Sequence, residues 1–572
     1  MQAYVKIATF GNSMNNKKLK VGVMLDSMHQ PAWVYHCLET ISQGDYATID
    51  TLILNATPVA PASSLTDKLL NNLEHLPSAI FEKVLHWIYK KILLNSCSEF
   101  DAFQTRKLDS LLGGCHQIPV LPIQTRFIDR FPTASVQAIQ DRELDVILRF
   151  GFRIIKGDIL HAARCGIWSF HHGDNMVNRG GPAGFWEVLE SWPVTGSVLQ
   201  ILTDDLDNGK VLYRSWTSTN DMSIVDNNNA HFWKTLAFMP RKLRELHALG
   251  CREFLNRVES SPRHPEFYSK PLYKFPGNSD LLKLLLEKTF QKIKGRLSDL
   301  FYFGQWAILY SFGDEITGAL WRYKRITPPK NRFWADPFPV YRNGKYYIFL
   351  EEYLYEENKA HIAVIELDES GQHGPARPVL EKPYHLSYPF IFEYEGSYYM
   401  VPETFSHQTI ELYRCTSFPD QWEFRMELMS NISAADATLY FYHGKWWLFA
   451  NMPELDGAST WDELHLFYSD ELLSQNWTPH PANPIVSDAR NSRPAGAIFE
   501  KDGRLYRPAQ NCQYRYGYGF NMNEITCLTE TEYREHPVAR VTPDWAKDIV
   551  ATHTFNHVNK LSVIDGHVRR RK

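Results

Sequence analysis

Residues that could carry acid–base chemistry gather between positions 166 and 209 of the sequence. An apolar run (IWSFH) ends in His171, and after a short polar loop comes the turn-forming sequence RGGP at 179–182. The stretch closes on DNG at 207–209. A histidine and an aspartate at two strand ends, with glycine-rich backbone between them, suit general acid–base catalysis. We therefore predict that His171 and Asp207 divide these roles.

The second half of the chain repeats a pattern of an apolar strand, a polar turn containing glycine and an aromatic strand. Four copies and a weaker fifth follow one another at intervals of about 48 to 59 residues. This period predicts an all-β five-bladed propeller over residues 301–572, with one blade for each copy. A strand at 305–310 precedes the first copy, and we expect it to pair with the last blade and close the ring.

Equivalent positions of a propeller lie round its central axis, so the repeat also predicts a channel site. Its predicted members are Asp336, Glu351, Glu403, Asp436, Arg493 and His553. Paired carboxylates are what glycosidic bond cleavage needs. The same positions equally suit an architectural role, in which they hold blade backbones or a structural cation. Sugar binding without cleavage is a third interpretation, with aromatic rings predicted at the rim: Trp334, Tyr388, Trp446 and Trp447.

The first half alternates strand-like and helix-like patterns over residues 18–260. Strands are predicted at 20–26, 51–54, 119–122, 145–150 and 167–171, and helices at 33–41, 134–142, 158–164 and 232–260. This alternation predicts an open, mostly parallel, Rossmann-type α/β sheet, whose ligands bind at the carboxyl ends of the strands, where His171 falls. Residues 57–115 are predicted to be an insertion with a helix at 80–94. No GxGxxG follows the first strand, which argues against a dinucleotide site.

Composition excludes several classes of protein. The chain has 572 residues with 61 basic and 65 acidic side chains, so no bulk positive charge indicates a nucleic-acid partner. Its 8 cysteines form no CxxC pair and no metal-ligand spacing, which predicts buried thiols in a reducing compartment and no metal site. No leader sequence and no long apolar run is recognised, so a cytoplasmic protein is expected.

Residues 261–300 are predicted to connect the two parts. A proline-rich linker leads into a basic amphipathic helix at 281–297. Such a helix either braces two domains or contacts the inner face of a membrane peripherally, and both interpretations stay open.

The first part resembles the formyltransferase family, which includes the methionyl-tRNA, glycinamide ribonucleotide and sugar N-formyltransferases. The family pattern is a strand ending in Asn-x-His, an Arg-Gly about eight residues later and a downstream Asp-x-Gly. Here His171, Arg179-Gly180 and Asp207-Asn208-Gly209 match it, and the resemblance covers about residues 18–260 without the insertion. It implies that His171 polarises an acyl carbonyl or holds the departing proton. Asp207 is implied to orient this histidine and to take up the proton of an attacking amine.

Two further features come from the same resemblance. Ser169 stands where the family has an oxyanion-stabilising asparagine, so it joins the implied catalytic residues. The loop at 172–175 (HGDN) is polar where the family's loop shapes a folate pocket. The donor is therefore either 10-formyltetrahydrofolate, as the resemblance implies, or another small-acyl donor. Four residues are implied to bind substrate: Asp174, Asn175, Arg179 and Gly180.

The repeats resemble the propellers of furanosidase-type glycoside hydrolases and, more closely, the propeller of plant glucosamine inositolphosphorylceramide transferases. Together, the two resemblances imply transfer of a formyl or small acyl group to an amino sugar of a surface polysaccharide or glycolipid. The propeller would hold the glycan, and a nucleotide sugar is a second possible substrate. Two alternatives stay open: a propeller-based glycoside hydrolase or glycosyltransferase, and a carbohydrate-binding scaffold without catalysis. A tRNA formyltransferase is disfavoured, because the C-terminal half is a propeller.

Overall fold

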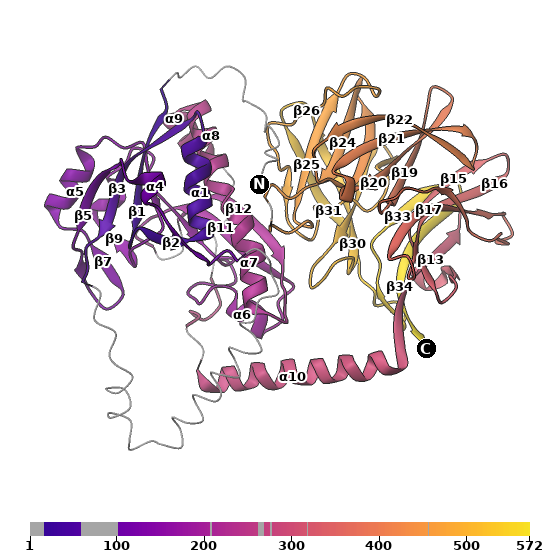
Figure 1. Ribbon diagram of the computed structural model, residues 1–572, viewed down its shortest axis with the longest axis horizontal. Coiled ribbons are helices and arrows are strands. Elements are labelled where there is room, and N and C mark those ends of the chain that lie inside the picture. The colour runs from indigo at the N-terminus through magenta and orange to yellow at the C-terminus, as the bar shows by residue number, and fades with distance from the viewer. Residues whose placement is uncertain are drawn as a thin grey trace. The chain divides into compact units, whose positions relative to one another are not determined.

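The computed structural model describes residues 17–58, 101–205, 209–260, 268–274, 277–316, 318–455 and 457–572. Most of the predicted insertion, including its helix at 80–94, lies outside the described residues, as does Asp207. The chain forms two compact units (Figure 1), one extending to Gln291 and the other beginning at Lys292. This boundary falls in the segment predicted to connect the two parts.

The first unit is built on a seven-stranded sheet of order β12-β11-β10-β8-β1-β3-β5. The five strands from β5 to β10 are parallel, while β11 pairs antiparallel with β10 and β12 pairs antiparallel with β11. The direction of winding reverses between β1 and β8, the place where open α/β sheets bind ligands. The predicted mostly parallel sheet is thus confirmed. Its strands are β1 (Leu19–Leu25), β3 (Ala47–Asn55), β5 (His116–Val120), β8 (Val146–Arg149), β10 (Ile167–His171), β11 (Val194–Ile201) and β12 (Lys210–Ser218).

Helices cover both faces of this sheet because its central strands are apolar on both sides. Helices α1 and α8, side by side in Figure 1, share a core with Val21, Val23 and Trp168, while α5 packs with Met24 and Ile147 on the other face. The helices are α1 (Ala32–Gln43), α4 (Asp109–Leu112), α5 (Thr133–Gln140), α6 (Phe185–Leu189), α7 (Ile224–Thr235), α8 (Phe238–Leu249) and α9 (Cys251–Ser260). Short strands complete the unit: β2 (His29–Pro31), β4 (Thr105–Lys107), β6 (Ile123–Gln124), β7 (Ile128–Arg130) and β9 (Ile154–Lys156).

Two expectations for this unit are corrected. The helix predicted at 158–164 is a single 3-10 turn, η2 (Asp158–His161), which follows Gly157 at φ 90°. Cys165 and Cys251, expected to be free thiols, are joined in a disulfide with Cα atoms 6.1 Å apart. The sequence pattern missed this pair because 86 residues separate the two cysteines.

The second unit contains five antiparallel sheets, which confirms the predicted five-bladed propeller. Blade 1 holds β15 (Arg332–Arg342), β16 (Lys345–Leu354), β17 (Lys359–Leu367) and β18 (Arg377–Leu380). Blade 2 holds β19 (Ser387–Tyr394), β20 (Ser397–Thr404), β21 (Thr409–Ser417) and β22 (Gln421–Ser430), with η4 (Phe405–His407) in a connection. Blade 3 holds β23 (Ala435–Tyr442), β24 (Lys445–Asn451), β25 (Glu463–Ser469), β26 (Thr478–Pro479) and β27 (Val486–Ser487). Blade 4 holds β28 (Phe499–Lys501), β29 (Arg504–Asn511), β30 (Gly519–Leu528) and β31 (Tyr533–Val541).

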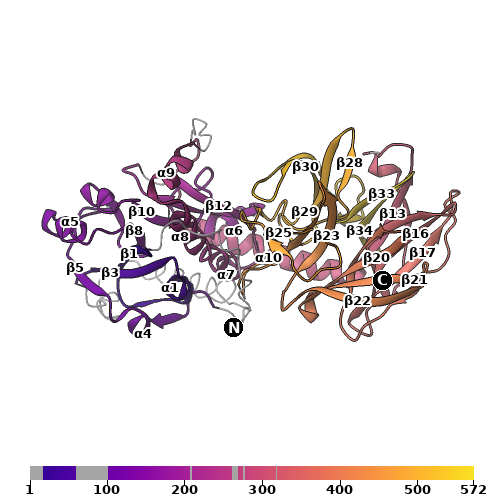
Figure 2. The ribbon, with the colours of Figure 1, turned by 90° about the horizontal axis from the view of Figure 1, so that it is seen from above.

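Blade 5 joins the two ends of the propeller. Its strands β32 (Ile549–Ala551), β33 (Phe555–Val558) and β34 (Leu561–Arg571) come from the end of the chain, and β13 (Tyr302–Phe312) and β14 (Lys324–Ile326) come from its start, with η3 (Leu320–Arg322) between them. Strand β13 pairs with β34 from Tyr302–Arg571 to Phe312–Leu561, and Figure 2 shows the two strands side by side. The predicted closing strand is therefore confirmed.

Helix α10 (Asn278–Phe301) runs directly into β13. Leu284 and Leu285 are buried against a cluster that includes Phe185 and Val188, which anchors the start of the helix. Among the described helices, none has the length and the apolar composition needed to span a bilayer.

Candidate functional site

The propeller repeat places its chemistry-bearing residues at a shared backbone irregularity. Asp336, Tyr388 and Asp436 each adopt positive φ (51°, 42° and 54°), at the point where the pairing of their strand with the next skips residues. Such a bulge turns a side chain away from the regular alternation of the strand. The residues just before them pair with three equivalent positions of the next strand: Glu351, Glu403 and Asn451.

The first group of buried side chains surrounds His553. Its Nε2 lies 3.3 Å from Asp336 Oδ1, and its Nδ1 lies 2.7 Å from Asp565 Oδ2. Thr554 also donates its hydroxyl to Asp336, at 2.8 Å. Burial alone lowers the pKa of His553, but Asp565 and Asp336 outweigh it and raise that pKa to about 9. His553 is therefore a cation at neutral pH.

These three groups also have the spacing of metal ligands. Within the part of the chain that the structure describes, one donor atom from each of Asp336, His553 and Asp565 lies within 4.8 Å of the others. A protonated imidazole already supplies the positive charge between the two carboxylates.

The second group of buried side chains surrounds Arg493. Its Nε lies 2.5 Å from Asp436 Oδ2, and its Nη2 lies 3.2 Å from both Asp436 Oδ1 and Glu403 Oε2. Gln510 donates to Asp436 at 2.8 Å, and the Tyr516 ring lies 4.9 Å from the guanidinium carbon. Burial lowers the pKa of Arg493, but the carboxylates outweigh it and raise that pKa further above its usual range.

Hydrogen bonds across the channel connect every blade to the next. Asp336 of blade 1 accepts from Thr554 of blade 5 and from the backbone N–H of Tyr388 in blade 2. Glu403 of blade 2 accepts from the N–H of Asp436 in blade 3, whose carboxylate holds Arg493 of blade 4. The Ala497 N–H of blade 4 returns to Asn556 of blade 5. The predicted channel residues thus close a circuit round the axis, which supports their architectural role.

Two channel positions contribute less to this circuit. Glu351 lies 3.3 Å from His385, and its burial raises its pKa to about 7. Asn451 is fully buried, and neither atom of its side-chain amide has a hydrogen-bond partner. Because unpaired buried amides are costly, Asn451 is a candidate for hydrogen bonding by a ligand.

The predicted aromatic rim is corrected, because all three of its tryptophans are buried. Trp446 and Trp447 are buried beside Phe392 and Tyr468 respectively, at the opposite end of β24 from Asn451. Trp334 is also buried and donates to Glu352, at 2.8 Å. Tyr388 does lie in the channel, where its hydroxyl bonds Thr438 at 2.9 Å and the Gly496 backbone.

In the α/β unit, Ser169 and His171 share one face of β10 because they are two residues apart. Ser169 Oγ accepts from Arg149 Nη1 at 2.9 Å, and both residues line a cavity of about 90 Å³ together with Gln200 and Asp204. His171 Nε2 lies 2.7 Å from the carbonyl oxygen of Asn178. A carbonyl can only accept, so Nε2 carries the hydrogen and proton exchange at this ring passes through Nδ1.

The predicted substrate-binding residues lie in a loop whose side chains are held by hydrogen bonds within the unit. Asp174 accepts from the Trp216 indole at 2.9 Å, and Asn175 accepts from Arg214 at 2.8 Å. Arg179 donates its Nε to the Asn175 carbonyl at 2.9 Å and stacks on Tyr268, 4.6 Å from the ring centroid. Gly180 has φ 113° and bridges to Tyr273, whose backbone leaves no room for a side chain. The position of Asp207 relative to His171 lies outside the described residues.

Several residues of these sites were not predicted. Arg149 ends an apolar strand and Asp565 interrupts one, and a charge in such a run is a signal that could have identified both. Glu187 is buried and bonds the Asn178 side chain at 3.0 Å, and burial raises its pKa to about 7. Because Glu187 lies in an ordinary helical pattern, the sequence gives no signal for it.

Comparisons with known proteins match the propeller. Residues 323–563 match the family described as "Glucosamine inositolphosphorylceramide transferase 1, N-terminal". The protein of that name from Oryza sativa subsp. japonica is 35% identical over 213 residues, 37% of this chain and 28% of the relative. The Arabidopsis thaliana protein is 33% identical over 258 residues, 41% of this chain and 34% of the relative. The chain therefore spans about a third or less of these relatives.

A solved structure, the family 117 glycoside hydrolase Zg3597 of Zobellia galactanivorans, aligns with 46% of this chain and 90% of its own. Its sequence identity is 13% and its TM-score 0.31.

Proposed function

We propose that this chain is a sugar-modifying transferase: its α/β unit transfers a small acyl group, such as formyl, to an amino sugar, and its propeller binds the glycan. The contact between Arg149 and Ser169 carries the first part of the proposal. Sequence relatives of the propeller are named glucosamine inositolphosphorylceramide transferases, and the amino sugar in that name supports an amino sugar as the substrate.

The proposed reaction uses four residues of the α/β unit. The acceptor amine attacks the acyl carbonyl, the new C–N bond forms, and the bond to the donor breaks. Arg149 and the Ser169 hydroxyl stabilise the oxyanion, since both line one cavity and a guanidinium adds the positive charge that a lone serine lacks. The amine proton passes to a base, for which His171 Nδ1 and Asp207 are the proposed groups.

The donor is proposed to be small or to enter only with its acyl end. The cavity beside Ser169 measures about 90 Å³, whereas pockets for whole drug-sized ligands measure roughly 300–1,000 Å³. A folate pteridine does not fit inside the cavity that the described residues form. 10-Formyltetrahydrofolate would place only its formyl end there, so it is tested beside other small-acyl donors.

An assay with nucleotide-linked amino sugars tests this proposal. Loss of the free amine is followed with 10-formyltetrahydrofolate or another acyl donor. Arg149→Gln should lower kcat by ~10²–10³, the usual effect of removing an oxyanion donor. Arg164→Gln is the matched control, because that arginine is exposed and pairs only with Asp145 among the ion pairs of the described chain. If the unmutated protein acylates no amino sugar, the proposal fails.

Asn451 supports the second part of the proposal. Its unpartnered amide lies in the channel at the position equivalent to Glu351 and Glu403, and sugar hydroxyls both donate and accept hydrogen bonds. Asn451→Leu should weaken the binding of amino-sugar glycans by about tenfold, which corresponds to about 1.4 kcal/mol of binding free energy. Calorimetry measures this change. Cleavage of the glycan that depends on Asp336 would instead favour a propeller hydrolase.

A further inference from the structure

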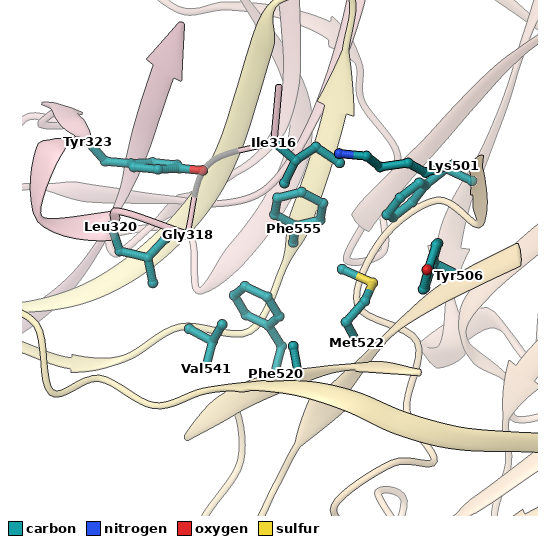
Figure 3. Close-up of a pocket in the computed structure, with 12 residues that line it drawn as sticks. Ile316, Gly318, Leu320, Tyr323, Lys501, Tyr506, Phe520, Met522, Val541 and Phe555 are labelled. Atoms are coloured by element: carbon teal, nitrogen blue, oxygen red, sulfur yellow. The ribbon is translucent and has the colours of Figure 1, made fainter. Parts of the chain in front are cut away.

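The propeller contains a second cavity, away from the channel, that the proposed reaction does not use. It measures about 270 Å³ and lies over one face of blade 4, beneath the segment between β13 and β14. Figure 3 shows Phe520, Met522 and Phe555 pointing toward its centre, with Leu320 and Val541 at one side.

Strand alternation explains why this cavity is apolar. On β30, Phe520 and Met522 point into it while Asn521 and Asn523 are buried on the other face, and on β31 Ala539 and Val541 repeat the same two-residue spacing. The segment that covers this face adds Leu320. The part of this blade face that lines the cavity is therefore mostly apolar.

The size of the cavity argues against a simple packing gap. The cavity opens to solvent, since Ala539 at its lining is exposed, and an apolar cavity of roughly 150 Å³ already binds benzene. A cavity of about 270 Å³ lined in this way suits a longer hydrocarbon group.

A single cationic group stands at this cavity. Among the described residues that line it, Lys501 is the one charged side chain, and Figure 3 shows its ammonium group beside Ile316. Lys501 Nζ lies 2.5 Å from Glu315, but the Glu315 side chain is 77% exposed and that of Lys501 is 39% exposed. Such surface pairs are weak, so the anionic group of a ligand can replace Glu315.

We propose that this cavity binds the hydrocarbon chain of an amphiphile whose anionic head pairs with Lys501. Resting on the function proposed above, this assigns the cavity to the lipid part of a glycolipid acceptor. The cavity and the channel share one short segment, since Phe555 lies two residues after His553. An acceptor with a lipid tail can therefore contact the propeller at a second place.

Calorimetry with dodecyl phosphate on the full chain tests this assignment. We expect saturable binding that Ala539→Trp, at the lining of the cavity, weakens at least ~10-fold, or 1.4 kcal/mol. The neighbouring Val538→Trp is the matched control: Val538 is exposed and does not line the cavity, so affinity should stay within about twofold of the unmutated protein. Equal melting temperatures of the two variants exclude a folding defect.

The head group is tested separately. Lys501→Gln should weaken dodecyl phosphate by about tenfold and leave dodecyl maltoside, which has a neutral head, unchanged. No saturable binding, or equal binding by the Ala539→Trp and Val538→Trp variants, overturns the proposal. Equal loss of both ligands in Lys501→Gln overturns the anionic head. These results do not depend on turnover, so failure of the acyl-transfer assay leaves them standing, and their failure leaves acyl transfer untouched.

Discussion

At the scale of single residues, Arg493 and His553 differ from an ordinary surface cation in being buried. Each is buried between two carboxylates, at least one of which comes from another blade, so each neutralises charge that would otherwise be costly to bury. The pairs hold separate blades together. Removing one partner should therefore cost much more than removing an exposed ion pair.

Arg493→Gln tests this difference. It leaves Asp436 and Glu403 without their cation, and such a loss typically destabilises by about 3–5 kcal/mol. Arg504→Gln is the control, since that arginine is 63% exposed beside Glu524 and its pair should contribute about 0–1 kcal/mol. Urea denaturation followed by tryptophan fluorescence gives both values. Similar midpoints for the two variants would show that the channel pair does not hold the blades.

The charge of His553 predicts a pH dependence. Its pKa is about 9 in the folded chain and about 6.5 when unfolded, so the folded state binds the proton more tightly. The stabilisation, roughly 3 kcal/mol at most, is present below pH 6.5 and is lost as pH rises through 9. The difference in stability between the unmutated protein and His553→Gln should therefore shrink between about pH 6.5 and 9. A difference that stays constant over this range would contradict a charged His553.

The sequence predicted which propeller positions meet, but not all their partners. The repeat period alone brings Asp436 and Arg493 to one axis, because equivalent blade positions are fixed by the turn and strand lengths. Asp565 was missed because its place beside His553 depends on the register in which β34 pairs with β32 and β33, which no repeated position specifies. Trp446 and Trp447 were misplaced at the rim, since the pattern does not show which end of a strand faces the channel.

At the scale of elements, α10 keeps an apolar stripe in solvent. Five of its apolar side chains, at spacings of three and four residues, are 52–67% exposed: Leu286, Phe290, Ile293, Leu297 and Leu300. Lys294 and Arg296 lie on either side of this stripe. The helix was predicted from its periodicity, and its membrane contact stays a proposal. Basic side chains on both flanks suit an anionic lipid surface better than a second copy of the same helix, whose lysines would repel.

Vesicle binding tests this stripe. Phe290→Glu should weaken binding to vesicles containing phosphatidylserine by about tenfold or more, because burying a phenylalanine contributes about 1.5–3 kcal/mol. Gln291→Glu adds the same charge one residue away, off the stripe, and should reduce binding far less. Co-sedimentation measures both. Equal effects, or dimerisation through α10 detected by light scattering, would contradict a membrane surface as the partner of this stripe.

At the scale of the whole molecule, the mostly parallel sheet and the five blades both follow from periodicity in the sequence, whereas the chemistry depends on contacts that periodicity does not encode. Ser169 and His171 share a face because strands alternate, which could be predicted. The Arg149 guanidinium beside Ser169 depends on the parallel register of β8 and β10, which pairs these two residues and which no local pattern specifies.

Closure of the propeller is the property of the whole molecule that a truncation can test. Strand β13 pairs along the full length of β34, so a fragment of residues 292–572 keeps all five blades, whereas 328–572 lacks β13 and β14 and leaves the edge of β34 unpaired. We expect the longer fragment to unfold cooperatively and the shorter one to aggregate or to melt at a much lower temperature, because an unpaired edge strand both loses its hydrogen bonds and recruits other chains. Thermal unfolding followed by near-ultraviolet circular dichroism compares them.

Adding a synthetic peptide of residues 302–326 should restore part of the lost stability in the shorter fragment, since it supplies the missing strands in trans. Equal melting temperatures, or a peptide without effect, would show that the C-terminal strands close the ring without β13.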